Sequence, residues 1–508
     1  MADHVIHTAA GRLSPKSSTT AADVQRIVEQ ACAAKAPGGI VVHFHGGLVS
    51  EKSARTSASE ALFPLYKEQA QAYPIFFIWE SGFFEAPLNN LGEILHESLF
   101  REFMKKSAVW VLKKLGGVDG LKGDAEVPVD EATLKNDMDA WFNGARATPP
   151  AELDVVDAAL VGGIAATSKG SMPDEEKLVE QIEASFEDDD AFRHAVESTY
   201  NGIGASAAPV ASNKGTGSTV ASDSLISKEA SERMFDAEPG KTKGVISWFK
   251  VAKTVATIVI RTIRRRRSGR SHGGYVTLVE ECLRELYLDK IGREIWWDRM
   301  KGDTADAFRD GDEYGGTAFL HALKHVVDQG GEVPKITLVG HSTGAIYICN
   351  LLRAANRIVP GLKYHVIFEA PAVSHDVFAA TLAEHATSIR FFRLFGMSDP
   401  REQDDDLVKV LYPASLLYFV SGMLEREVDL PLVGMERFLI NDTVFGNDDF
   451  WSIEVCRKFF ARHSECLIWS PHQGGPGLAS TGKSHSEFDD KDRATLDSVA
   501  YIILNQPR

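Results

Sequence analysis

Cysteine is scarce in this chain, and the few cysteines present show no pattern. None of them forms a CxxC pair, and they are scattered through the 508 residues as Cys32, Cys282, Cys349, Cys456 and Cys466. This distribution predicts neither a disulfide framework nor a zinc site, and a reducing cytoplasm is the simplest compartment. The sequence also has no HExxH motif and its histidines are dispersed, so we expect no metal site.

Long apolar runs and an excess of positive charge are also missing. No uncharged run of ~18 apolar residues occurs, and the first residues, MADHVIHTAAGRLSPKSS, have no apolar core of signal-peptide type. We therefore expect neither secretion nor a membrane-spanning helix, and a cytoplasmic location. The 71 acidic and 55 basic residues give a net charge of −16, which argues against general nucleic-acid binding.

What the sequence does contain is an alternation of short apolar runs and helix-forming stretches. Hydrophobic residues make up 44% of the chain, which is ample for a large core. A strand is predicted at 40–44 and another at 74–79, with a helical segment between them that is kinked near Pro64. Such a βαβ unit implies parallel strands. The alternation returns after residue 315, with strands predicted at 336–339, 364–368, 388–395 and 466–469. We predict an α/β fold whose mostly parallel central sheet carries helices on both faces.

The alternation is interrupted by one large insertion. We predict a first part of the core at 1–81, beginning with a loose leader at 1–18, an insertion at 82–313, and a second part of the core at 314–508. The insertion is expected to be a mainly helical or partly disordered cap. Its stretch 148–238 has low complexity and the composition of loops or disorder.

A basic amphipathic segment lies inside the insertion at 244–270. Its apolar residues alternate with lysines, and six arginines close it. The segment is too short and too charged to span a bilayer, but Ile246–Arg270 is typical of an interfacial helix that contacts anionic lipid or an acidic partner. The alternative is a cap helix whose apolar face covers the active-site cleft and whose arginines are solvated or paired with the acidic insert.

Two stretches match the pattern Gly-x-Ser-x-Gly. GRSHG at 269–273 follows an arginine run, and we interpret it as a flexible loop. GHSTG at 340–344 follows the apolar run Ile336–Val339 and precedes residues with helical spacing. A serine in such a strand-turn-helix elbow is exposed to substrate by a strained backbone. Ser342 is therefore the candidate nucleophile.

A serine nucleophile needs a base and a carboxylate that orients the base. In a parallel sheet these groups are expected on loops after the carboxyl ends of strands. Asp399 follows the strand at 388–395 and is the favoured acid, with Glu369 and the cluster 404–406 as rivals. His485 directly precedes the last helix and is favoured as the base over His472, which lies in a Gly-Pro-rich loop.

The oxyanion that forms on the substrate also needs donors. The backbone N–H of Thr343, next to the nucleophile, is one of them by geometry. The second is expected from the loop after the first predicted strand, where glycines allow an amide to face the substrate. We assign it to Gly47, with Gly46 and Leu48 as neighbours.

These motifs together resemble the α/β-hydrolase superfamily. The order Ser342, Asp399, His485, with HFHGGL upstream and GHSTG at the elbow, is the triad order of that superfamily. With the FIWE strand end, EAPA and SHSEFD, the chain looks like a group of bacterial serine hydrolases with a large insertion. The resemblance covers 35–81 and 315–505, and it implies an α/β-hydrolase fold, acyl hydrolysis and no cofactor.

The sequence thus predicts a serine hydrolase that cleaves a carboxylic ester or lipid through an acyl-enzyme. Its expected partner is a small-molecule or lipid ester substrate. A peptidase, amidase or thioesterase uses the same machinery and is the first alternative. The second is a non-catalytic scaffold on a hydrolase fold, with the insertion as its interaction surface.

Overall fold

A computed structural model describes residues 2–14, 19–47, 49–80, 85–116, 130–153, 172–206, 224–235, 246–292, 296–446, 448–463 and 465–506. The chain forms two compact units. The sheet unit comprises residues 1–85, 294–406 and 414–508. The helical unit comprises residues 86–293 together with the short stretch 407–413.

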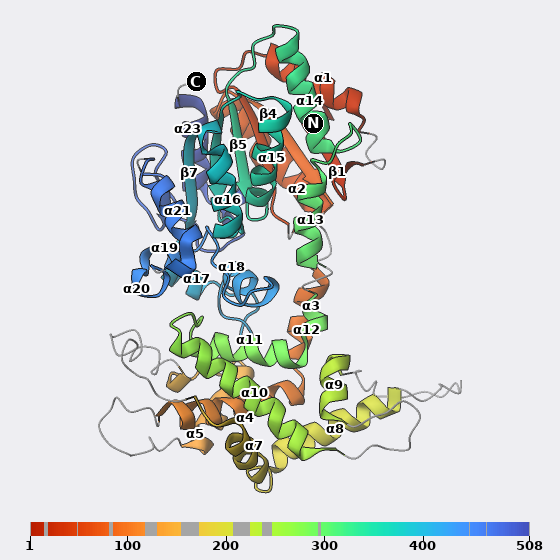
Figure 1. The fold of residues 1–508 in the computed structure, drawn as a ribbon, viewed down its shortest axis with the longest axis vertical. Helices are drawn as coiled ribbons and strands as arrows, with labels where there is room; N and C mark the ends of the chain where they lie inside the picture. The colour runs from red at the N-terminus through yellow and green to blue at the C-terminus, as the bar shows by residue number, and fades with distance from the viewer. Residues whose placement is uncertain are drawn as a thin grey trace. The chain divides into compact units, whose positions relative to one another are not determined.

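The sheet unit is built on one eight-stranded sheet in the order β2-β1-β4-β3-β5-β6-β7-β8 (Figure 1). All neighbouring strands run parallel except β1 and β2. Most of the strands consist of apolar residues because helices cover both faces of the sheet. The predicted α/β fold with a mostly parallel sheet is confirmed. The strands are β1 (Val5–Ala9), β2 (Arg12–Leu13), β3 (Ile40–Phe44), β4 (Tyr73–Trp79), β5 (Ile336–His341), β6 (Tyr364–Glu369), β7 (Ile389–Met397) and β8 (Leu467–Ser470).

One face of the sheet packs against a row of helices through aromatic side chains. Phe44 of β3 stacks on Tyr347, with ring centroids 4.7 Å apart, and Phe392 of β7 packs on Phe459 and Phe460. Each helix in the row contacts the next. The row consists of α1 (Ala21–Ala33), α14 (Gly315–Asp328), α15 (Gly344–Ile358), α16 (His375–His385) and α21 (Trp451–Phe460).

The opposite face carries a second hydrophobic core. Val339, Ile367 and Phe395 of the strands pack there with Tyr66 and Val499 of the helices. Helices labelled η are 3₁₀ or π turns, and the predicted kink at Pro64 corresponds to the junction of two π-helical turns. The elements on this face are α2 (Glu51–Ser57), η3 (Ala58–Leu62), η4 (Leu65–Gln69), α22 (Glu487–Asp490) and α23 (Arg493–Asn505).

Shorter helices complete the sheet unit at its edges and loops. They are η1 (Ala2–His4), α13 (Asp298–Asp306), η7 (Ala386–Ser388), α17 (Asp399–Asp404), α18 (Leu416–Phe419), η8 (Val420–Leu424), α19 (Arg437–Ile440), α20 (Asp442–Phe445) and η9 (Asp448–Phe450).

The prediction of a loose leader at 1–18 is wrong for its first half. Strand β1 lies in this half, and its residues Val5 to Thr8 pair with β4 and are buried. His7 and Thr8 are fully buried polar residues, so the strand lacks the continuous apolar run on which the sequence prediction depended. Residues 15–18 lie outside the described residues.

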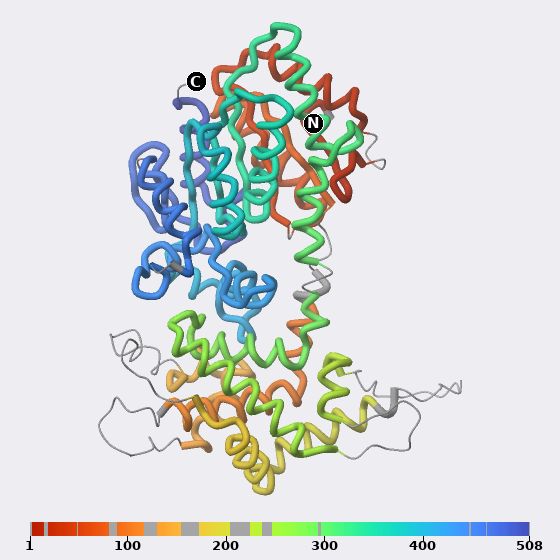
Figure 2. The backbone as a smooth tube through the Cα atoms, viewed as in Figure 1, coloured from red at the N-terminus to blue at the C-terminus, as the bar shows by residue number. Residues whose placement is uncertain are grey.

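The helical unit contains α3 (Glu85–Ile94), α4 (Ser98–Gly116), α5 (Glu131–Phe142), α7 (Glu175–Ala184), α8 (Asp190–Ser206), α9 (Lys228–Met234), α10 (Trp248–Arg267), α11 (Gly274–Leu286) and α12 (Leu288–Ile291). Helix α10 contacts α4, α7, α9 and α11 and is therefore the centre of the unit (Figures 1 and 2). The low-complexity stretch 148–238 contributes three of these helices, which its composition did not predict.

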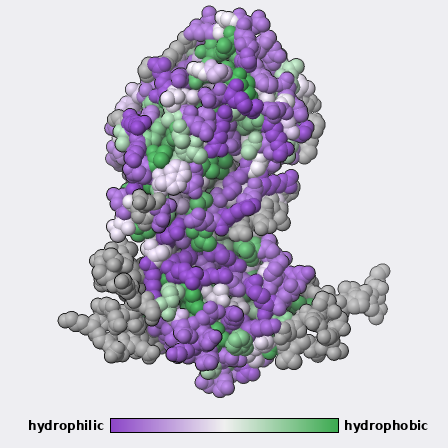
Figure 3. Space-filling view, viewed as in Figure 1, coloured by the Kyte–Doolittle hydropathy of each residue, from purple (hydrophilic) through white to green (hydrophobic). Residues whose placement is uncertain are grey.

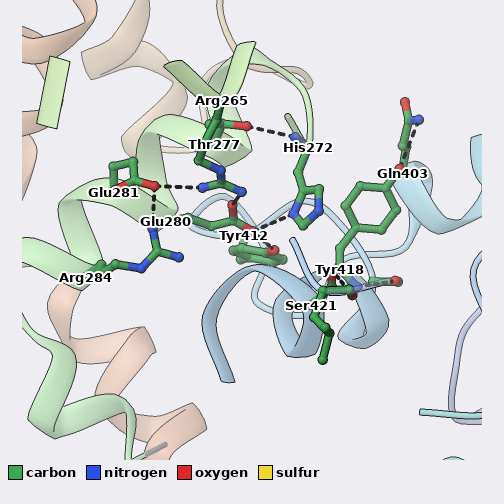
Figure 4. A network of polar contacts seen from close by, with 12 residues as sticks. Arg265, His272, Thr277, Glu280, Glu281, Arg284, Gln403, Tyr412, Tyr418 and Ser421 are labelled. Carbon is green, nitrogen blue, oxygen red and sulfur yellow. Dashed lines mark hydrogen bonds and ion pairs between the residues drawn. The ribbon is translucent and has the colours of Figure 1, made fainter. Parts of the chain in front are cut away.

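The basic segment is a packed helix of this unit. Most apolar side chains of α10 between Val251 and Ile263 are buried, whereas Phe249 is exposed. Arg265 is also buried and forms ion pairs with Glu280 and Glu281 of α11 (Figure 4). Most of the apolar face of the segment is therefore used in packing within the helical unit, and part of its positive charge is neutralised there.

A second group of bonds converges on Glu280. Its carboxylate accepts hydrogen bonds from His272, at 2.8 Å, and from the hydroxyl of Tyr412, which belongs to the stretch 407–413 (Figure 4). Burial opposes ionisation of Glu280, but Arg265 and His272 hold its pKa well below the usual range. The carboxylate is therefore charged and fixes the stretch 407–413 to the helical unit.

The coloured residues on the face shown in Figure 3 are mainly hydrophilic. On the face shown in Figure 3, apolar residues reach the surface in small patches among polar ones. Within the described parts of the chain, no helix combines the length and the apolar character needed to cross a membrane.

His375, at the start of α16, is a histidine buried in the sheet unit. Burial, with a smaller contribution from the positive charge of Arg457, lowers its pKa to about 3. The unfolded chain takes up a proton at this histidine near pH 6.5, whereas the folded chain does not. Between these two pKa values the unfolded state binds more protons, so the free energy of unfolding falls as the pH falls.

We therefore expect His375 to reduce the free energy of unfolding by about 2 kcal/mol between pH 7 and pH 5. Urea denaturation at the two pH values measures the change, and His375→Gln should lack this share of it. His472→Gln, at an exposed histidine, is the control. A His375→Gln variant with the full wild-type pH dependence would contradict the prediction.

Candidate active site

Ser342 occupies the turn between β5 and α15, and its backbone is left-handed, with φ of 53°. This conformation is unusual for a residue with a side chain. Its N–H donates to the carbonyl of Glu369 at 2.9 Å, and its own carbonyl accepts from Ala372 at 3.0 Å. The bonds to the end of β6 and the segment after it hold the turn in its strained form. The side chain is buried, with 3% of its surface exposed.

Two glycines of the elbow make this turn sterically feasible. A Cβ at Gly344 would lie 2.2 Å from the carbonyl oxygen of Phe44, and one at Gly340 would lie 2.7 Å from the carbonyl carbon of Gly344. Both distances are shorter than real Cβ atoms tolerate. The start of α15 can therefore pack directly on β3 only because both positions lack side chains.

The loop after β3 lies against the elbow. A Cβ at Gly46 would be 3.2 Å from the Cβ of Ser342, and one at Gly47 would be 2.7 Å from Oγ1 of Thr343. Among the described residues, the backbone N–H groups of Gly46, Gly47 and Thr343 donate no hydrogen bond. The structure thus brings these predicted oxyanion residues close to Ser342. Leu48 lies outside the described residues.

His45 fixes this loop. Its Nδ1 donates to the carbonyl of Gly46 at 2.7 Å, and its Nε2 accepts from the backbone N–H of Trp79 at 3.1 Å. Burial lowers the pKa of His45 to about 4, so the imidazole is neutral at pH 7 and can accept the Trp79 bond.

His485 lies on the loop between β8 and α22 and is 6% exposed. Its N–H donates to Asp405 at 3.0 Å, and its carbonyl accepts from Nε2 of His341 at 3.1 Å. The preceding residues are held by Asp492, which accepts from the N–H groups of Thr481 and Gly482 at 2.8 Å each. The backbone of His485 is therefore anchored to the elbow through the histidine that precedes Ser342.

The His485 side chain is neutral and unpaired. Burial lowers its pKa well below the usual value, the neighbouring His341 lowers it further, and the charge of Asp489 partly opposes this shift. Neither ring nitrogen has a hydrogen-bond partner among the described residues. The ring is thus in the protonation state of a base, but the bond to Ser342 is not formed. The rival His472 is exposed and donates to the carbonyl of Leu478 at 2.6 Å.

Asp399 begins α17, directly after β7 and Ser398. Its carboxylate accepts hydrogen bonds from the hydroxyl of Tyr418 at 2.7 Å and from the side chain of Gln403 at 2.8 Å. Figure 4 shows the side chains of Tyr418 and Gln403. The structure therefore places Asp399 at the expected strand end but pairs it with these residues and not with the ring of His485.

The two rival acids have different surroundings. Asp405, from the cluster 404–406, contacts the backbone N–H of His485. Burial, followed by the nearby charges of Asp489 and Asp492, raises the pKa of Glu369 well above its usual value. Both Glu369 carboxylate oxygens lack a hydrogen-bond partner among the described residues.

A buried group of charged residues beneath the elbow was not predicted as a site. Asp489 of α22 lies 3.1 Å from Nε2 of His43 and 3.9 Å from Nδ1 of His341. Burial opposes ionisation of Asp489, but the neighbouring His43 and His341 hold its pKa well below the usual range. The only sequence signal for this group is the placement of histidines inside the apolar strands β3 and β5.

Comparison with protein-family models, curated proteins and solved structures returns no match. A serine hydroxyl, unpaired backbone donors beside it and a neutral imidazole on a neighbouring loop are the components of nucleophilic acyl transfer.

The elbow geometry predicts a large difference between two glycine substitutions. Gly344→Ala introduces a Cβ against the Phe44 carbonyl, and we expect it to destabilise the protein by at least about 1–3 kcal/mol. Gly302→Ala, in the interior of α13 with open space around it, should be neutral or stabilising by up to about 1 kcal/mol. Differential scanning calorimetry measures both, and equal melting temperatures for the two variants would disprove the close packing at the elbow.

Proposed function

We propose that the protein is a serine hydrolase of the α/β-hydrolase type, with Ser342 as its nucleophile. One observation carries the proposal. Ser342 adopts a left-handed backbone at a strand-to-helix turn, beside a glycine loop whose N–H groups are unpaired among the described residues. Backbone strain at a non-glycine residue persists only where the surrounding structure enforces it, and it is frequent at catalytic nucleophiles.

The topology of the sheet unit supports this proposal. Ser342 follows β5, Asp399 follows β7, and His485 follows the edge strand β8. The order serine, acid, histidine along the chain is the one found in α/β-hydrolases. The resemblance of the motifs to that superfamily and the arrangement of the strands thus point in the same direction.

The reaction follows from the chemistry of these groups. Ser342 Oγ attacks the acyl carbon of the substrate while its proton passes to His485, and the negative oxygen binds the N–H groups of Thr343 and Gly47. The alcohol leaves with the proton from His485, and an acyl-enzyme remains. Water then attacks the acyl group in the same way and releases the acid, which restores Ser342.

In this proposal His485 must turn toward Ser342 when substrate is bound. Catalytic hydrogen bonds are often absent or long in free enzymes and form in the substrate complex. The anchored backbone of His485 and its unpaired ring nitrogens are compatible with such a rotation. Asp399 remains the proposed orienting acid because of its place at the strand end, and Gln403 and Tyr418 then hold its carboxylate.

The leading substrate class is a carboxylic ester or lipid. Peptides, amides and thioesters react through the same groups and are the competing classes. A panel of p-nitrophenyl esters of graded chain length, beside peptide and thioester panels, distinguishes them.

A fluorophosphonate probe tests the nucleophile. We expect the wild-type protein to be labelled and Ser342→Ala to lose labelling completely, because the probe reacts with activated serines. Ser271→Ala, in the second Gly-x-Ser-x-Gly match, is the matched control and should be labelled like the wild type. Equal labelling of wild type and Ser342→Ala, or labelling of neither, would contradict the proposal and favour a non-catalytic scaffold.

A second experiment tests the acid. If Asp399 orients His485, Asp399→Asn should reduce the kcat/KM for the best ester by about a hundredfold or more. Asp404→Asn, at an exposed carboxylate one helical turn away, should change it less than threefold. Steady-state kinetics measure both values. Wild-type turnover by Asp399→Asn would remove Asp399 from the mechanism.

A further inference from the structure

Three buried polar side chains lie close together on the face of the sheet that α22 and α23 cover. His43, Glu369 and Asp489 are 2%, 1% and 6% exposed. Both carboxylate oxygens of Glu369 make no hydrogen bond to any described residue, whereas Nε2 of His43 and Oδ1 of Asp489 face each other at 3.1 Å. Orphaned polar groups at this degree of burial are costly and require an explanation.

The three side chains converge on one point. His43 Nε2 lies 3.1 Å from Asp489 Oδ1, and one ligand atom from each of the three residues lies within 4.8 Å of the other two. His43 and Glu369 extend from strands β3 and β6, and Asp489 reaches them from α22. The atoms are therefore supplied by three segments that are distant in the sequence.

The charge of this group is not balanced by the usual cations. Neither Glu369 nor Asp489 forms an ion pair with a lysine or arginine of the described residues. Two carboxylates that are withdrawn from water need a cation or a shared proton between them. A proton on Glu369 still leaves its buried carboxyl group without a hydrogen-bond partner among the described residues, whereas a metal ion engages all three side chains.

The imidazole nitrogens are directed for metal binding. Nδ1 of His43 pairs with the hydroxyl of Tyr66 at 3.0 Å, which leaves Nε2 for an ion. Nε2 of His341 donates to the carbonyl of His485, so in the neutral ring Nδ1 carries a lone pair. That Nδ1 is also unpaired and lies 3.9 Å from Asp489 Oδ2. It lies on the same side of the sheet as the three converging side chains. A metal-bound histidine whose second nitrogen is hydrogen-bonded is the usual arrangement.

We propose that His43, Glu369 and Asp489, with His341 as a fourth donor, form a binding site for a divalent transition-metal ion of the zinc type. Tetrahedral zinc with bonds of about 2.0–2.2 Å places its ligand atoms roughly 3.3–3.5 Å apart, close to the His43 to Asp489 separation. Two carboxylates neutralise the charge of the ion. Calcium and magnesium are excluded because they require mainly oxygen ligands and, for calcium, six or more of them.

The proposed ion has a structural role. It joins β3 and β6 to Asp489 of α22, four residues after His485, and the carbonyl of Glu369 accepts the N–H of Ser342. The site does not require Ser342 to be catalytic. Ser342→Ala should therefore bind the metal as the wild type does, and the two proposals can fail separately.

Elemental analysis and calorimetry test the site on the full-length protein. We expect the wild type, as purified, to carry about one equivalent of metal per chain. Removal of the ion with dipicolinate should lower the melting temperature by several degrees, and one equivalent of ZnCl₂ should restore it. X-ray absorption of the zinc form should show nitrogen and oxygen neighbours at about 2.0–2.2 Å and no sulfur.

Matched variants separate this site from adventitious binding. Glu369→Gln and His43→Gln should lose at least tenfold in zinc affinity, whereas His472→Gln and Asp404→Asn should keep it. Substitutions at buried ligands can impair folding. The metal content and the melting shift of the wild type are therefore the primary test of the site. Wild type that holds no metal and shows no melting shift with ZnCl₂ overturns the proposal, as do sulfur neighbours or unchanged binding by a folded Glu369→Gln.

Discussion

The left-handed backbone of Ser342 is the constraint on which the candidate site depends. Such a conformation costs about 1–3 kcal/mol and persists only where neighbouring structure enforces it. Here β6 accepts the Ser342 N–H, and Gly344 allows α15 to begin directly on Phe44 of β3. The three central strands therefore fix the serine, and the order β3-β5-β6 places the glycine loop after β3 beside it.

The sheet was predictable where apolar residues form a continuous run. Strands β3 to β8 are mainly apolar, because helices bury both faces of the sheet. Strand β1 does not, because His7 and Thr8 are buried polar residues in a strand of five. The helices within 148–238 were also missed, since low complexity hides the few apolar positions, such as Leu178 and Ile182, that bury each helix. In both cases tertiary packing, and not local composition, determines the secondary structure of the segment.

The sequence could predict those parts of the candidate site that lie directly after the ends of strands. Ser342, Thr343, Gly46 and Gly47 lie together because β3 and β5 are neighbours. The sequence could not predict the hydrogen-bond partners of Asp399, because Tyr418 belongs to α18, which follows a long loop. Likewise, the proximity of Asp489 to two strand histidines depends on how α22 packs under the sheet.

Burial has opposite consequences for the histidines and the carboxylates around the elbow. It keeps His45 and His485 neutral, which suits a loop anchor and a proton acceptor. The same burial imposes a high free-energy cost on ionised carboxylates at Glu369 and Asp489 unless positive charge lies close to them. The backbone carbonyl of Glu369 accepts the Ser342 N–H, and its side chain lies beside His43 and Asp489. A group that binds the Glu369 side chain would therefore also act on the end of β6, whose backbone holds the strained turn that presents the serine.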